Sequence, residues 1–233
     1  MNLIGIDISI DSTGMSVFRG EELILFNFTT MKRSVLWIKK MMEYVDFEFI
    51  NYTYKIIENY TEKEIMKLRE FDFVTNLIYN KIIGNIDKNE KTIIAIEGYN
   101  YGLRNTNSIV DIVSFSTLLR VKLLTIPNLE KIIIISPKSI KKEIAEKSYG
   151  FTLTKSGKKN INKNLEGTSG GNFDKKDVLM ALLNMDIENK LTSMLNRHKE
   201  ELLKLKNVPK GIDDVIDSFF IASLLYDVPQ KID

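Results

Sequence analysis

Four acidic residues stand in stretches that are otherwise apolar. Asp7 interrupts an N-terminal apolar run, and Glu97 ends the apolar run 93–96. Asp214 and Asp217 lie in the apolar stretch 212–222 and are three residues apart, which places both on one face of a helix. Because removing an unpaired carboxylate from water costs several kcal/mol, each of these acids needs a compensating partner.

A divalent cation is the partner that the composition favours. The chain has no Cys and a single His, His198, to which we assign no role. This excludes disulfides, thiolate metal sites, Cys nucleophiles and multi-His zinc sites. No His or Arg stands close in sequence to neutralise the four acids, and clustered carboxylates are the hard oxygen ligands that Mg²⁺ and Mn²⁺ prefer. We therefore expect a shared metal site.

Each acid also has a simpler interpretation. Asp7 could end a strand in a turn, and Glu97 could be exposed beside Gly98. Asp213 is expected to be the N-cap of the last helix rather than a metal ligand, because it follows Gly211 and Ile212. The metal hypothesis therefore depends on the four acids taken together.

A basic segment is concealed by the net charge of +2. Residues 131–176 contain 11 lysines and four acids, a net charge of +7, which leaves −5 for the rest of the chain. Such a segment favours a polyanionic partner, although a solvated lysine-rich loop would have the same composition. The lysines that we expect to contact nucleic acid are Lys138, Lys142, Lys158, Lys159 and Lys176.

Two tyrosines and an arginine closely follow Glu97. Tyr99 and Tyr101 could stack on unpaired bases, which contributes about 1–3 kcal/mol per base, and Arg104 could contact phosphate. Ordinary packing of the tyrosines and a plain surface arginine are the alternatives.

The hydrophobic pattern predicts one mixed α/β domain over residues 1–233, with a central sheet and insertions at about 30–60 and 148–172. Strands are expected at 3–10, 14–18 and 23–28, as an antiparallel meander, and at 92–97 and 131–135, both covered on two faces. Residues 34–60 suggest a helix followed by irregular or strand-like structure. Further helices are expected at 61–84 (with a Thr61–Glu64 capping box), 108–124, from Pro137, 174–184, 188–206 and 214–226. No apolar run suits a membrane span and no secretory segment is visible, so we expect a cytoplasmic protein.

The order of these motifs resembles that of the RuvC-like Holliday-junction resolvases, a family of the RNase H-like superfamily. Ile4-Gly5-Ile6-Asp7, followed by Ser12-Thr13-Gly14, resembles the family's opening. Residues 94–97 look like its second acidic strand, and 214–222 are similar to its final helix. Segments 136–142 and 175–178 resemble its two lysine-bearing segments, although a longer insertion replaces the Gly-x-Gly element between them. The length and the Ile/Lys/Asn-rich composition resemble those of phage or viral members.

This resemblance implies a fold, an activity and a set of site residues. The fold would be an RNase H-like mixed five-stranded sheet with flanking helices. The activity would be endonucleolytic resolution of four-way junctions by a homodimer, with two Mg²⁺ ions per active site and Mn²⁺ as a substitute. Asp7 would bridge both ions, and Glu97, Asp214 and Asp217 would complete their coordination. Lys141 (or Lys142) and Lys175 would hold phosphates near the scissile bond.

Three other functions fit parts of the same pattern. A nuclease of this fold could act on flaps, forks or packaging DNA instead of four-way junctions. Actin-like phosphotransferases and ATPases share the opening motif, but they need a further glycine-rich phosphate loop, for which Gly170-Gly171 is the only candidate. An RNase H-like domain that binds nucleic acid without cutting it would be expected to have lost some of the four acids.

Overall fold

A six-stranded sheet runs through the computed structural model, which describes residues 1–30, 35–98, 106–149, 153, 157–159 and 172–226. The sheet order is β4-β3-β2-β1-β5-β6. β2 runs antiparallel to its neighbours β1 and β3, whereas the pairs β1/β5, β5/β6 and β3/β4 are parallel. The strands are β1 (Asn2–Asp7), β2 (Ser12–Arg19), β3 (Glu22–Thr30), β4 (Asp46–Ile50), β5 (Thr92–Glu97) and β6 (Leu129–Ile135).

This topology confirms the mixed α/β class and the antiparallel meander of the first three strands. Strands β3-β2-β1-β5-β6 make the five-stranded mixed sheet of an RNase H-like fold. The expected number of five strands is wrong for the whole sheet, because β4 adds a sixth strand beside β3. β4 and the preceding α1 (Val35–Met41) belong to the 30–60 insertion, where a helix followed by strand-like structure was expected.

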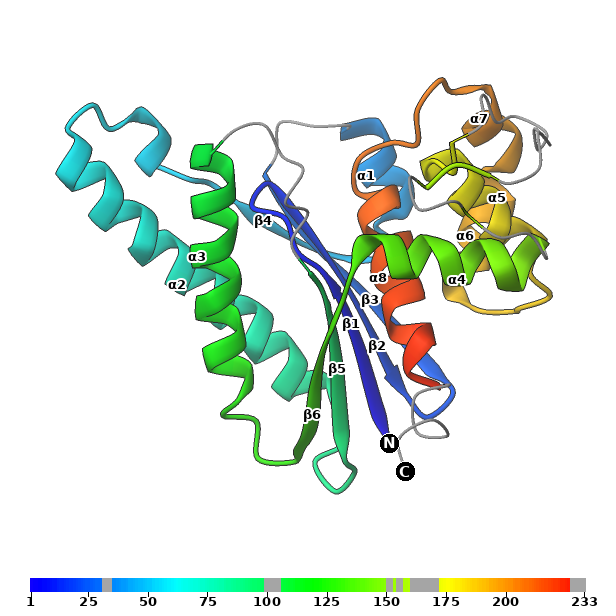
Figure 1. Ribbon diagram of the computed structural model, residues 1–233, viewed down its shortest axis with the longest axis horizontal. Coiled ribbons are helices and arrows are strands. Elements are labelled where there is room, and N and C mark those ends of the chain that lie inside the picture. Colours follow the sequence, from blue (N-terminus) through cyan, green and yellow to red (C-terminus); the bar gives the residue numbers. More distant parts are fainter. Residues whose placement is uncertain (31–34, 99–105, 150–152, 154–156, 160–171, 227–233) are drawn as a thin grey trace.

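Helices cover both faces of the sheet (Figure 1). α2 (Tyr60–Asn85) and α3 (Thr106–Leu123) pack on one face, in a core that includes Phe71, Ile78 and Phe115. The other face carries α1, α4 (Pro137–Tyr149), α5 (Lys175–Asn184), α6 (Lys190–Arg197), α7 (Lys199–Lys204) and α8 (Ile212–Ser223). Two 3-10 turns, η1 (Tyr54–Ile56) and η2 (Leu224–Tyr226), complete the described elements. Among the described residues, no helix combines the length and apolarity needed to cross a membrane.

Three local expectations are wrong. The N-cap of α2 is Asn59, whose side chain accepts a hydrogen bond from the Glu62 amide, so Thr61 and Glu64 do not form the expected capping box. The stretch 188–206 contains two short helices, α6 and α7, instead of one long helix. β6 is not covered on both faces, as was expected for 131–135. It is an edge strand that pairs only with β5, and its Ile134 is 47% exposed.

Side-chain alternation in β1 and β5 decides which residues face α8. Successive side chains of a strand point to opposite faces. Leu3 of β1 and Ile93 and Ala95 of β5 contribute to the core beneath α8, whereas Ile4, Ile6, Ile94 and Ile96 contribute to the core beneath α2 and α3. Asp7 and Glu97 continue the first set, so both carboxylates leave the sheet on the side of α8.

Two glycines let α8 lie directly on the sheet. A Cβ atom added at Gly5 of β1 would lie 2.2 Å from the carbonyl oxygen of Ser218. A Cβ atom added at Gly14 of β2 would lie 2.1 Å from the carbonyl oxygen of Asp214. Since real Cβ atoms do not approach so closely, any larger residue would push α8 away from the strands. The glycines thereby bring the α8 acids close to Asp7.

Candidate active site

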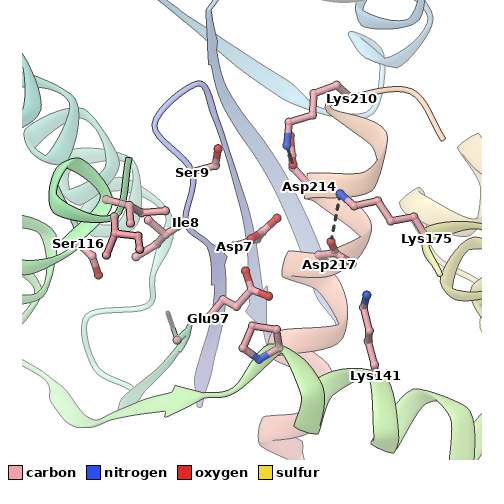
Figure 2. Close-up of a pocket in the computed structure, with 14 residues that line it drawn as sticks. Asp7, Ile8, Ser9, Glu97, Ser116, Lys141, Lys175, Lys210, Asp214 and Asp217 are labelled. Carbon is pink, nitrogen blue, oxygen red and sulfur yellow. Dashed lines mark hydrogen bonds and ion pairs between the residues drawn. The ribbon is translucent and has the colours of Figure 1, made fainter. Parts of the chain in front are cut away.

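Four carboxylates from three distant parts of the chain line one cavity. Asp7 ends β1 and Glu97 ends the neighbouring β5, where the register pairs Ile6 with Ile96 immediately before them. Asp214 and Asp217 lie on the first turns of α8, which runs along β1 and β2 and begins at the same end of the sheet. All four line a cavity of about 310 Å³, which we call the acidic cleft. Figure 2 shows Asp7 and Glu97 on one side and the α8 acids opposite them.

Burial and mutual repulsion make these carboxylates hard to ionise together. Burial, followed by the charges of Glu97 and Asp217, raises the pKa of Asp7 well above its ordinary value. The pKa of Asp217 is raised to about 7, by burial first and then by the charge of Glu97, against the opposing charge of Lys175. The pKa of Asp214 is raised by burial and by Asp213, against the effect of Lys210. The cleft therefore holds excess negative charge that a cation would relieve.

Three lysines supply positive charge around the same cleft. Lys175, at the start of α5, forms ion pairs with Asp213 and, at 3.9 Å, with Asp217. Lys210, just before α8, forms an ion pair with Asp214. Lys141 of α4 lines the cleft beside them, and its amine points toward the acids (Figure 2). The structure thus brings the sequence-predicted Lys141 and Lys175 to the acids, whereas Lys142 of α4 is exposed to solvent.

Lys210 is the residue that sequence reasoning missed. It lies four residues before Asp214, a spacing that could have suggested an ion pair across one helical turn. The turn at 209–211 hides this spacing, because α8 begins only at Ile212. Burial lowers the pKa of Lys210, but Asp214 and Asp213 outweigh that effect and raise it. Lys210 therefore stays charged at neutral pH.

The four carboxylates are the type of oxygen ligand that a hard divalent cation prefers, but they are not arranged around one common point. In the described part of the chain, no group of three or more acidic or His side chains is placed so that it could hold one ion. Asp214 instead accepts hydrogen bonds from Ser12 and Lys210, and Asp217 faces Lys175. An ion held between the strands and α8 would compete with Lys175 for the Asp217 carboxylate.

Asp213 is not the N-cap of α8, contrary to expectation. Gly211 occupies the N-cap position with a φ of 95°, and no side chain caps the helix there. Asp213 lies within the helix, accepts a hydrogen bond from the Gly211 amide and binds Lys175. The expectation failed because α8 begins two residues earlier than its apolar pattern indicated.

The predicted DNA-contacting lysines separate into exposed and buried ones. Lys138 of α4 and Lys158 are exposed. Lys159 is not available for DNA, because its amine is buried and bonded to the buried Asp177 at 2.6 Å. Lys176 is half-buried and donates a hydrogen bond to the Leu203 carbonyl. Tyr99, Tyr101 and Arg104, together with Gly170 and Gly171, lie outside the described residues.

Comparisons with known proteins return structural similarity without sequence similarity. No protein-family model and no curated protein matches the sequence. RuvC of T. thermophilus in complex with a Holliday junction substrate is 11% identical, with a TM-score of 0.46 over 98% of this chain and 96% of that one. The yeast mitochondrial Holliday junction resolvase Ydc2 is 14% identical, with a TM-score of 0.46 over 94% of this chain and 75% of that one. At such low sequence identity and TM-score, neither similarity establishes the function of the cleft.

Proposed function

We propose that this protein is a divalent-metal-dependent endonuclease that cuts branched DNA, with four-way junctions as the preferred substrate. The convergence of Asp7, Glu97 and Asp217 on one cleft that is also lined by lysines carries the proposal. Buried carboxylates that repel one another attract divalent cations, and lysines beside them attract phosphate. A phosphodiester linkage supplies the anionic group that such a combination would bind.

The protein's own residues would divide the work between the two sides of the cleft. Asp7 and Glu97 would hold cations from the strand side, and Asp217 would join them from α8. Bound Mg²⁺ or Mn²⁺ ions would supply an activated water and stabilise the charge that develops on the phosphate oxygens. Lys141 and Lys175 would hold the phosphate on either side of the scissile bond. Asp214, bound to Ser12 and Lys210, would keep α8 oriented on β2, whether or not it also reaches an ion.

An Asp7→Asn variant tests this assignment. Loss of the carboxylate from β1 should lower the cleavage rate of a synthetic four-way junction by at least about 100-fold in Mg²⁺, the scale on which electrostatic groups in active sites act. Junction binding, measured in EDTA by gel shift, should survive. The matched control is Asp11→Asn, which makes the same change at a half-exposed position paired with Lys55. Cleavage at the wild-type rate by Asp7→Asn would contradict the proposal.

The substrate preference needs a separate comparison. Wild-type protein should be assayed with and without Mg²⁺ on a four-way junction, a flap, a fork and linear duplex. Paired symmetric nicks on the junction would support a homodimer, since two cuts across a two-fold substrate match two active sites related by a two-fold axis. Faster cutting of flaps or forks would retain the nuclease and replace its substrate.

A further inference from the structure

The acidic cleft has a second, apolar side that its metal and phosphate chemistry does not use. Ile8, just beyond Asp7, and Ile109 and Ile112 of α3 line the cavity together with Ser116. In Figure 2, Ile8 and Ser116 lie on the α3 side of the acids, away from Lys141 and Lys175. A phosphate and its cations would contact the carboxylates and lysines, which leaves the isoleucines to contact a different part of the substrate.

Ser116 carries a hydroxyl on this apolar side that finds no partner in the part of the chain that the structure describes. The residue is fully buried, and among the described residues its Oγ makes no hydrogen bond. Leaving a buried hydroxyl unsatisfied costs about 1–3 kcal/mol, so such groups usually receive a partner from elsewhere. Ser116 is among the residues that line the cleft, so a turn of its side chain about the Cα–Cβ bond would let a ligand in the cleft supply this partner.

We propose that the isoleucine side of the acidic cleft binds one unpaired nucleobase next to the scissile phosphate, and that the Ser116 hydroxyl bonds to the edge of that base. This inference rests on the proposed function. A nucleobase has apolar faces and a rim of donors and acceptors, which match the isoleucines and the single hydroxyl. It can enter only when it is unstacked, as bases at a branch point can be. The subsite would therefore contribute to both branch preference and cut-site sequence.

The experiment places 2-aminopurine, one position at a time, around the branch point of a four-way junction. Binding is measured with wild-type protein in EDTA, so that cleavage does not intervene. We expect a fluorescence change at one position beside the cut site, and an affinity that depends on which base stands there. Ser116→Ala should reduce that base preference by roughly 2- to 10-fold, the value of one hydrogen bond, without lowering the melting temperature. Ile112→Asp should abolish the fluorescence change.

Ser148→Ala is the matched control, because its Oγ is also buried and has no partner within the described part of the chain, but the residue does not line the cleft. It should leave the base preference unchanged. A junction that is bound and cut with no responding position, or an unaltered preference in Ser116→Ala, would overturn the base subsite and leave the nuclease intact. A wild-type protein that neither binds nor cuts branched DNA would overturn the proposed function and the subsite with it.

Discussion

At the residue scale, each of the two α8 acids in the cleft is paired with a lysine, whose amine supplies positive charge beside the carboxylate. Asp217 faces Lys175 at 3.9 Å and Asp214 binds Lys210, so each carboxylate has an internal partner. These pairs do not neutralise the cleft, because the pKa values of Asp7, Asp214 and Asp217 are all raised. Burial, together with repulsion among the carboxylates, therefore outweighs the attraction of the nearby amines, and the metal-free protein should be least stable when every acid is ionised.

This imbalance predicts an unusual pH dependence of stability in EDTA. The pKa of Asp217 is about 7 in the folded protein and 3.8 in a free side chain, so the folded state holds the extra proton between these values. The contribution of Asp217 to stability should therefore be fully present below about pH 3.8, fall as the pH rises toward 7 and then level off. The melting temperature should be at least about 2 °C higher at pH 5 than at pH 8.

Asp217→Asn should flatten that profile, because it removes the titrating carboxylate. Asp186→Asn, the same change at an exposed position, should preserve the wild-type profile. Calorimetry or thermal circular dichroism across pH 4–9 measures both variants. Equal slopes in wild-type protein and Asp217→Asn would show that Asp217 does not take up the proton.

At the element scale, the close contact between α8 and the strands determines the geometry of the site. Gly14→Ala would force a Cβ atom against the Asp214 carbonyl and displace the first turn of α8. Such overpacking typically costs about 1–3 kcal/mol of unfolding free energy, and the shift of Asp214 and Asp217 should also slow DNA cleavage. Chemical denaturation and the junction assay measure the two effects.

Gly84→Ala is the control for this substitution. Gly84 lies in α2 with nothing within 4 Å of an added Cβ, so alanine there should raise helix stability by about 0.5–1 kcal/mol. Wild-type stability and cleavage in Gly14→Ala would mean that α8 moves freely on the sheet, and that its contact with β2 does not position the acids.

Most individual helices and strands could be predicted from the sequence, whereas the contacts between them could not. Apolar runs bounded by turns predicted β1, β2, β3 and β5 and thereby placed Asp7 and Glu97. The edge position of β6 could not be predicted, because its apolar run has the same composition as a central strand and periodicity does not distinguish the two. The pairing of Lys175 with Asp217 could not be predicted, because it depends on the packing of α5 against α8. Ser12, at the start of β2, donates a hydrogen bond to Asp214 only because α8 lies on that strand.

At the scale of the whole molecule, the basic segment divides between the cleft and the surface next to it. Lys141 and Lys175 line the cleft, Lys138 and Lys142 are exposed on α4, and Lys159 is committed to Asp177. α4 begins at Pro137, directly after β6, and runs across the α8 side of the sheet (Figure 1). Lys138 and Lys142 are exposed along this helix. A DNA arm that leaves the cleft along α4 would place phosphates near them.

This arrangement predicts a specific salt dependence of junction binding. Each phosphate contact releases counterions and contributes about −0.9 to the slope of log affinity against log salt concentration. If both exposed lysines contact phosphates, Lys138→Ala/Lys142→Ala should make the slope shallower by about 1.8 and weaken binding most at low salt. Lys88→Ala/Lys91→Ala removes the same charge before β5, at the end of the sheet opposite Glu97, and should leave the slope unchanged. Equal changes in both double variants would indicate that DNA samples the surface without a preferred path, and no change in either would exclude α4 from the contact.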